Sequence, residues 1–328
     1  MKGFTNVSSV GTDLRTRKVE RMVARAEHLV LKLATITIGA AYIKFTNSQV
    51  VSRWRNQGMP RPVFPGRVAL VAHVYYTDLI DEILACYASL PLEADLIVTT
   101  PSNTRQEAAN RLARLKRVKV IEVPNRGRDI APFLSLLNDG VLDKFDVVLK
   151  IHTKRSPHLR DGNIRRKLIF AGLAGSHKRA TQALQLFENP AVGLVGWKPC
   201  WRNSRFYWMK NCQWAEKITT RMAIPLPEEP AFFEGSMFWV RPSALERLRA
   251  LNLSTSDFES EAGQTDGALH HAIERVFCLA VAGGGYVVRD CKGVHLFGPC
   301  SASSDQTANC LDEKLGTITN QEPAQASN

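Results

Sequence analysis

The chain has 328 residues, of which 45% are hydrophobic and 23% charged, a composition typical of a globular protein long enough for one large α/β domain with appendages. Its formal net charge is +12, and its seven cysteines form no CxxC pair. This cysteine pattern excludes a disulfide framework and a zinc site of the usual spacing, so reduced thiols in a cytoplasmic protein are the simplest interpretation.

Residues 1–66 carry much of the positive charge, with eleven lysines and arginines against three acidic residues. The Pro/Gly-rich stretch 58–66 marks a linker, so we expect a basic helical extension ahead of a separate domain. The charge favours anionic partners, namely lipid head groups, nucleic acid or phosphorylated substrates, or is simply that of a solvated helix. Residues 29–45 are apolar but interrupted by Lys32 and Lys44, which predicts an amphipathic or partly buried helix and leaves peripheral membrane contact open.

Apolar runs and helical periodicities alternate along residues 67–300. The expected strands are residues 67–74, 94–100, 118–123, 145–151, 191–196, 238–240 and 286–289. The expected helices are residues 79–90, 104–115, 130–137, 168–186, 243–251 and 267–279, and residues 197–230 are expected to be irregular and rich in aromatic side chains. The alternation predicts an α/β domain over residues 67–300, with a mainly parallel open sheet flanked by helices. Residues 301–328 are polar and are expected to form a disordered tail.

The segment from Asn125 to Asp129 follows an expected strand and opens a helix. Gly127 permits a tight turn, and Asp129 can cap the helix, whose first N–H groups can face an anion. Arg126 and Arg128 supply fixed positive charge suited to a diphosphate. An ordinary strand-to-helix turn with an aspartate cap explains the same residues, but two arginines around a turn glycine favour the functional interpretation.

The next expected strand ends abruptly in His152, Thr153, Lys154 and Arg155. Metal-dependent sugar transferases place two carboxylates at such a position to hold a divalent cation. An imidazole and two cationic side chains can instead neutralise a diphosphate leaving group directly, without a metal. The alternative interpretation is a solvated basic loop.

Glu234 precedes a small pair, Gly235-Ser236, that leads into a short expected strand. Glycine at such a position lets a ligand or another backbone come close. The alternative is a β-bulge beside core aromatic residues.

Asp266 stands at the expected start of the last helix, where its carboxylate is fixed near the edge of the sheet. A carboxylate held in this way can accept a proton from a sugar hydroxyl. A helix N-cap is the alternative role, and it explains Asp266 on its own.

Five stretches together resemble the rhamnan synthesis F family, whose members act in bacterial cell-wall and O-antigen polysaccharide assembly. They are residues 73–84, 125–134, 149–156, 235–242 and 266–275. The resemblance covers residues 67–295 and implies a role in the synthesis of rhamnose-rich or related surface polysaccharides.

More distantly, the layout is similar to the GT-A glycosyltransferases, in which a DxD strand end, a Gly-Gly-x strand start and a later helix-cap aspartate follow in this order. By that analogy Asp266 matches the catalytic base, with Glu234 the next candidate, and Gly235-Ser236 matches the acceptor-side loop. The chain departs from the pattern because His152-Thr153-Lys154 stands where DxD would be. That departure puts metal dependence in doubt.

The resemblance implies an inverting glycosyltransferase that moves a sugar, such as rhamnose or another deoxyhexose, from a nucleotide-sugar donor to a growing surface polysaccharide, with no cofactor and no metal site. His73 and Asp78 would line the nucleotide pocket. The remaining donor-binding residues would be Asn125, Arg126, Gly127, Arg128, Asp129, His152 and Lys154. Trp208 would stack on the sugar rings of a glycan or lipid-linked glycan acceptor, and core packing is its alternative role.

Two other function classes fit parts of the sequence. A non-catalytic module of the same fold would bind glycan or scaffold a synthesis complex. A nucleic-acid-binding protein is disfavoured, because no nucleic-acid motif occurs and the basic extension lacks interleaved aromatic residues apart from Trp54. No apolar signal-peptide core occurs early in the chain, so we expect a cytoplasmic protein that contacts the inner face of the cell membrane through residues 1–66.

Overall fold

The structure is a computed structural model that describes residues 22, 26 and 63–299, apart from residues 92, 154 and 156–161. The expected disordered tail, and nearly all of the expected basic extension, lie outside the described residues. The expectations for both segments therefore stay predictions.

Within the described residues, eight strands form one sheet in the order β10-β9-β5-β8-β4-β1-β2-β3. Their bounds are β1 Val68–His73, β2 Asp95–Thr100, β3 Val118–Glu122, β4 Val147–His152, β5 Val192–Gly196, β8 Phe238–Val240, β9 Val287–Asp290 and β10 His295–Phe297. Strands β1 to β4 pair in parallel, β8 is antiparallel between β4 and β5, and β5 pairs in parallel with β9. The predicted α/β class with a mainly parallel open sheet is confirmed, and the arrangement is consistent with a GT-A-like sheet. A separate two-stranded sheet joins β6 (Trp201–Arg202) to β7 (Phe232–Phe233).

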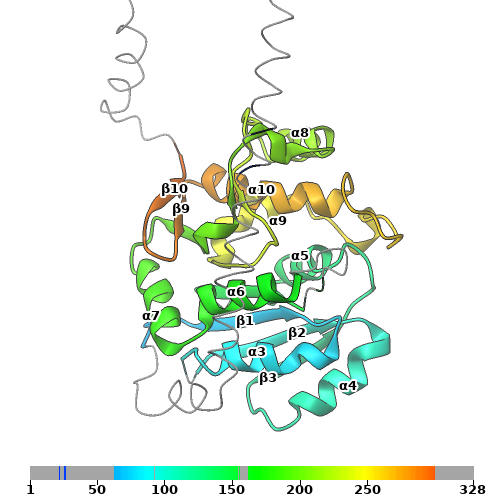
Figure 1. The fold of residues 1–328 in the computed structure, drawn as a ribbon, viewed down its shortest axis with the longest axis vertical. Coiled ribbons are helices and arrows are strands. Elements are labelled where there is room, and N and C mark those ends of the chain that lie inside the picture. The colour runs from blue at the N-terminus through cyan, green and yellow to red at the C-terminus, as the bar shows by residue number, and fades with distance from the viewer. Residues whose placement is uncertain are drawn as a thin grey trace, which may run out of the picture. The chain divides into compact units, whose positions relative to one another are not determined.

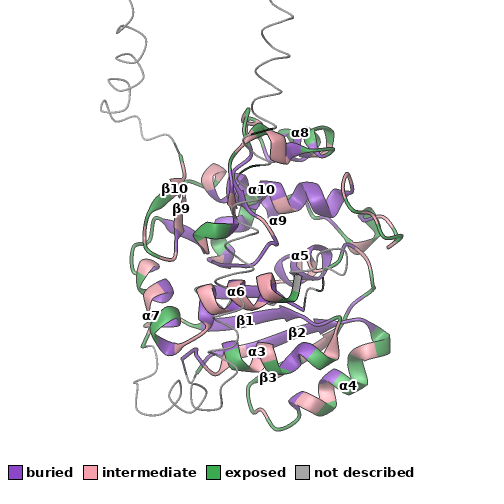
Figure 2. Cartoon of the chain, in the orientation of Figure 1, coloured by how far each residue is buried: buried purple, intermediate pink, exposed green. Residues whose placement is uncertain are grey.

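The central strands β1 and β4 are buried along their whole length because helices cover both faces of the sheet. The helices are α3 Ile80–Tyr87, α4 Ser102–Leu112, α5 Ile130–Asn138, α6 Gly162–Ala174, α7 His177–Leu186, α8 Cys212–Arg221, α9 Glu246–Arg249 and α10 Leu269–Gly283 (Figure 1). All six residues of β1 and of β4 are buried. Figure 2 shows β1 and most of α10 coloured as buried, whereas much of α4 is coloured as exposed.

Neighbouring residues of β8 identify the helices on each face of the sheet. The Phe238 ring lies 5.1 Å from the ring of Phe277 in α10, which also contacts Phe133 of α5 at 6.1 Å. The next residue, Trp239, donates its indole N–H to the Leu173 carbonyl of α6. Successive strand residues point to opposite faces, so α5 and α10 cover one face and α6 covers the other.

Some predicted boundaries were wrong for local reasons. The single helix expected over residues 168–186 is two helices, because Ser176 caps α7 by accepting the Arg179 N–H. The segment expected to be irregular, residues 197–230, contains α8. Its polar composition hid a narrow apolar stripe formed by the buried Ala215 and Ile218. The three-residue strand β10 was also missed, since so short a run carries no clear period.

None of the described helices is both long enough and apolar enough to cross a membrane.

Candidate functional site

Strands β1 and β4 end side by side at the edge of the sheet. His73 and His152 are their last residues, pair in register and are both buried. Thr153 Oγ1 accepts hydrogen bonds from the backbone N–H groups of Tyr75 at 2.9 Å and Tyr76 at 3.0 Å. These bonds hold together the two segments that follow β1 and β4. Open α/β sheets bind their ligands at this carboxyl edge.

Beneath these strand ends lies a buried ionic group that we call the Asp129 cluster, formed by Asp129, Lys150, His152 and Ser236. Asp129 Oδ2 lies 2.6 Å from Lys150 Nζ, 2.7 Å from Ser236 Oγ and 3.1 Å from His152 Nδ1. Lys150 Nζ also donates to the Ser236 carbonyl at 2.8 Å. The Lys150 side chain is only 2% exposed, so its ammonium group requires a counter-ion and hydrogen-bond acceptors, which the cluster supplies.

The predicted capping role of Asp129 is wrong. Asp129 is the N-cap residue of α5, but its side chain makes no capping hydrogen bond. The carboxylate instead faces Lys150, because a buried ammonium group binds a carboxylate more strongly than the N–H groups at a helix end do.

Electrostatics fix the charge states of the cluster and its neighbour His73. Burial alone would raise the pKa of Asp129, but the charges of His152 and Lys150, with their hydrogen bonds, hold that pKa well below its ordinary value. Burial lowers the pKa of His73 to about 4, a shift that the Asp129 charge opposes and that His152 and Lys150 reinforce. At neutral pH, therefore, Asp129 is ionised and His73 is neutral.

The pKa of His73 predicts acid sensitivity. The unfolded chain takes up this proton near pH 6.5 and the folded chain only near pH 4, so the free energy of unfolding should fall as the pH is lowered between these values. One such group contributes a slope of at most about 1.4 kcal/mol per pH unit. Urea unfolding across this range, compared with His73→Gln, measures the contribution. An equal slope in the variant and the wild type would assign the acid sensitivity to other groups.

Gly127, the glycine of the predicted diphosphate motif, lets the turn pack closely against Phe258. Gly127 has a φ of 63°, and a Cβ atom there would lie 2.7 Å from the ring of Phe258. The preceding residue, Arg126, is half-buried and forms an isolated antiparallel bridge with Ser260. The turn therefore docks against the segment 258–264, a contact that sequence spacing could not reveal.

Arg128 extends this contact toward α10. Its Nε lies 3.5 Å from Glu261 Oε2, its Nη1 lies 3.4 Å from His271 Nε2, and its Nη2 donates to the Gln264 carbonyl. The side chain is 42% exposed, so the guanidinium group remains accessible to a ligand. Asn125 is exposed. The diphosphate-binding role of these residues stays a prediction.

Asp266, the predicted base, is held by three neighbours. Its carboxylate accepts from the Lys210 N–H at 3.0 Å and from Asn211 Nδ2 at 2.6 Å, and Arg275 lies 3.7 Å away. Burial raises its pKa, but the hydrogen bonds from Asn211 and Lys210 and the charge of Arg275 outweigh burial and lower it. The capping alternative is wrong, because Ala268 is the N-cap residue of α10. Asp266 instead anchors the segment that leads into α8.

Glu234 and the pair after it belong to different networks. The Glu234 carboxylate lies 2.5 Å from Arg165 and 2.8 Å from Arg202. The Gly235 N–H donates to Glu274 at 2.6 Å. Ser236, with a φ of 46°, turns its carbonyl and hydroxyl into the Asp129 cluster. The structure thus connects Ser236 to the expected donor-side residues rather than to a separate acceptor loop.

Of the remaining predicted residues, Asp78 and Trp208 make contacts outside the Asp129 cluster. Asp78 pairs with Arg155 at the surface, and the Arg155 guanidinium stacks over the Tyr76 ring at 4.6 Å. Lys154 lies outside the described residues. Trp208 is only 4% exposed and donates its indole N–H to the Glu228 carbonyl, so its ring offers no open face for a sugar and the core-packing alternative is the better account.

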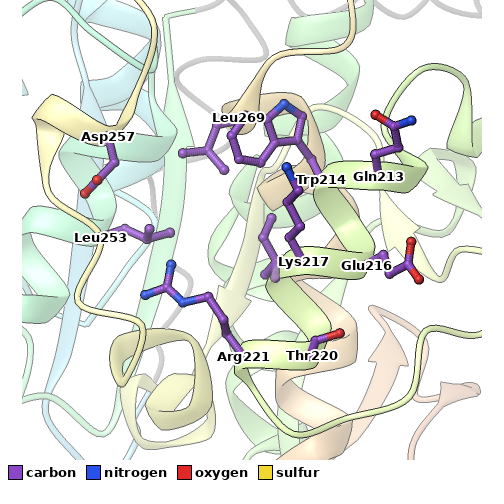
Figure 3. A pocket seen from close by; sticks show the side chains of 10 residues that line it. Gln213, Trp214, Glu216, Lys217, Thr220, Arg221, Leu253, Asp257 and Leu269 are labelled. Atoms are coloured by element: carbon purple, nitrogen blue, oxygen red, sulfur yellow. The ribbon is translucent and has the colours of Figure 1, made fainter.

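A pocket of about 590 Å³ opens between α8, the 253–257 segment and the start of α10 (Figure 3). Trp214 and Lys217 project into it from α8, and Leu269 of α10 lies beside the Trp214 ring. Trp214 is partly exposed, and Lys217 Nζ lies 5.1 Å from its ring centre. Because α8 begins directly after Asn211, the pocket lies next to the Asp266 contact.

Sequence reasoning did not select Lys150, although the signal was present. A lysine in the middle of the otherwise apolar run Val147–His152 predicts a buried charge that needs a partner. In the part of the chain that the structure describes, no group of three or more His, Cys, Asp or Glu residues is placed to hold a metal ion.

The chain is similar in sequence to one known protein family and to two curated proteins. The family model described as rhamnan synthesis protein F matches residues 28–286. Two proteins named uncharacterized protein WxcX, from two strains of Xanthomonas campestris pv. campestris, are each 34% identical over 221 residues. The match covers 67% of this chain and 32% of each relative, so the chain spans about a third of the length of these relatives.

Proposed function

Since the chain belongs to the rhamnan synthesis F family, which acts in polysaccharide biosynthesis, we propose that it is a glycosyltransferase. It moves a sugar, such as rhamnose or another deoxyhexose, from a nucleotide-sugar donor to a growing bacterial surface polysaccharide. We propose that the reaction takes place at the cytoplasmic face of the membrane. The observation that carries the proposal is the meeting of His73, His152 and the Asp129 cluster at the carboxyl edge of a GT-A-like sheet, where such folds bind nucleotides.

In the proposed reaction, the donor diphosphate lies over the ends of β1 and β4. Arg126, Arg128 and His152 face the negative charge that develops on the leaving group, and fixed donors and cations lower the energy of such a transition state. The sequence adds Lys154 to this set, which lies outside the described residues. Asp266 takes the proton from the acceptor hydroxyl, so that the acceptor oxygen attacks the anomeric carbon as the bond to the diphosphate breaks. The acceptor glycan extends from Asp266 across the neighbouring pocket, whose Trp214 ring suits the apolar face of a sugar.

A second candidate function is a non-catalytic glycan-binding or scaffolding module of the same fold. The observation that favours it is the occupied carboxylate of Asp266, because two hydrogen bonds and a lowered pKa make it a weaker base. Donor turnover by the purified protein separates the two candidates.

A thermal-shift screen against nucleotide sugars tests donor binding directly. A ligand that binds only the folded state, present at 100 times its Kd, stabilises that state by about 2.7 kcal/mol, so the melting temperature should rise. A rise with one nucleotide sugar, larger than that with free sugar, is the expected result. No shift with any nucleotide sugar would contradict the proposal.

We also expect donor binding to survive removal of divalent cations. The strand end that carries His152 has no carboxylate pair, and cationic side chains there can take the role of a metal. Calorimetry with and without EDTA measures the difference. A loss of donor affinity of tenfold or more after EDTA treatment, about 1.4 kcal/mol, would contradict metal-independent donor binding.

A further inference from the structure

His270 is a buried histidine at the start of α10, and its contacts do not explain why a polar side chain stands there. His270 is 4% exposed, and neither of its ring nitrogens has a hydrogen-bond partner among the residues that the structure describes. A neutral imidazole carries one donor and one acceptor, and buried polar groups in native proteins are nearly always paired. The His270 ring lies 4.1 Å from the ring of His271, and an apolar side chain would fill this buried position without the cost of unpaired polar atoms.

A second unpaired atom lies in the same neighbourhood. Glu261 Oε1 is buried and has no hydrogen-bond partner among the described residues, while Oε2 of the same carboxylate faces Arg128 Nε. Arg128 and Glu261 both act electrostatically on His270, as do Asp129 and Glu259. The His270 ring lies 4.1 Å from the His271 ring, and His271 Nε2 lies 3.4 Å from Arg128 Nη1, so the imidazole is close to the Glu261–Arg128 pair.

The chemistry of these atoms selects a hydroxyl over a phosphate. The unpaired Glu261 Oε1 belongs to a carboxylate, so it requires a hydrogen-bond donor, which a hydroxyl supplies and an ionised phosphate oxygen does not. A hydroxyl is neutral and can both accept and donate a hydrogen bond. It matches an imidazole N–H and a carboxylate oxygen that are both unpaired.

We propose that His270 and Glu261, with Arg128 beside them, recognise a hydroxyl group of the sugar carried by the nucleotide donor. The His270 N–H donates to the hydroxyl oxygen, and the hydroxyl donates to Glu261 Oε1. The group enters beside Arg128, which is 42% exposed, and Glu261, which is 22% exposed. This inference rests on the proposed function, because it assigns a role in the same donor site.

The test compares nucleoside diphosphate-sugars with the diphosphates that lack the sugar. Calorimetry with dTDP-rhamnose, GDP-rhamnose and UDP-glucose, and with dTDP, GDP and UDP, gives the affinity that the sugar adds. We expect His270→Phe and Glu261→Gln each to lower the affinity that the sugar adds by roughly tenfold or more, the size of a lost buried hydrogen bond. His270→Phe should leave diphosphate binding unchanged. Glu261→Gln also removes the charge that faces Arg128, so its effect is measured as the ratio of the nucleotide-sugar affinity to the diphosphate affinity. In the absence of ligand, His270→Phe should melt at or above the wild-type temperature, because it removes an unpaired polar group.

His177 supplies a matched control, since it is equally buried but its Nδ1 lies 3.1 Å from the Ser89 carbonyl. His177→Phe should lower the melting temperature and leave sugar recognition intact. If both site variants bind the nucleotide sugar as the wild type does, the inference is wrong while the transferase proposal stands. If the wild type binds none of the nucleotides, both are wrong. Glu261→Gln keeps the test decisive should His270→Phe fail to fold.

Discussion

Asp266→Asn is expected to reduce sugar transfer by roughly 10²–10⁴-fold, the usual contribution of a positioned general base. Asparagine has nearly the same size and keeps one oxygen for Asn211 or the Lys210 N–H, but it cannot take a proton from the acceptor. Donor affinity should stay near the wild-type value, because the base faces the acceptor. Steady-state turnover and calorimetry on the same preparations separate these quantities.

Asp266→Ala is the companion variant, because it also removes the anchor of the segment that enters α8. Loss of these hydrogen bonds should lower the free energy of unfolding by about 1–3 kcal/mol, and the melting temperature reports it. If Asp266 is only an anchor, Asp266→Asn will turn over at the wild-type rate. Glu234 would then be the next candidate base, although Arg165 and Arg202 already engage it.

Lys150→Met is expected to lower the free energy of unfolding by about 3–5 kcal/mol. It removes one partner of a buried ion pair and leaves the Asp129 carboxylate without one of its two neighbouring counter-charges. Methionine fits the site, because the ammonium group lies 5.4–5.8 Å from the ring centres of Phe133, Phe238 and Phe277. The destabilisation is therefore electrostatic and not a consequence of a cavity.

The double variant Lys150→Met/Asp129→Asn serves as the control. It removes both charges, so it should recover part of the stability that the single variant loses. In the wild type, the depressed pKa of Asp129 gives stability that is present above the unfolded pKa of 3.8 and is lost only as the pH falls below it. Urea unfolding of the three proteins at neutral pH measures the effect. An unchanged stability in Lys150→Met would show that the pair does not stabilise the fold.

The sequence predicted the parts of the fold that depend on local pattern. The apolar runs placed the central strands within one or two residues, and so placed His73 and His152 at strand ends. The family resemblance was confirmed as well. The sequence did not predict the roles of side chains whose partners lie far along the chain. Asp129 and Asp266 look like helix caps in sequence, but each binds a side chain far along the chain, Lys150 and Asn211 respectively.

Other site features escaped prediction for a related reason. The positive φ of Ser236 turns that residue into the Asp129 cluster, and no spacing rule indicates the direction of such a turn. The exposure of an aromatic ring is likewise a tertiary property, so Trp208 and Trp214 could not be ranked in advance as buried and pocket-lining. His270 stood inside a recognised motif, yet only the packing around it shows that its ring nitrogens are unpaired.

Sugar transfer from a nucleotide donor is the activity that we propose for this chain. The most direct measurement is the release of nucleoside diphosphate by the purified full chain, with a rhamnose-containing glycan as acceptor and Asp266→Asn as the control. We expect acceptor-dependent release with one nucleotide sugar and a rate lower by at least about 10²-fold in the variant. Tight binding of a nucleotide sugar or glycan, with no release above the rate of the variant, would contradict it and identify a binding module instead.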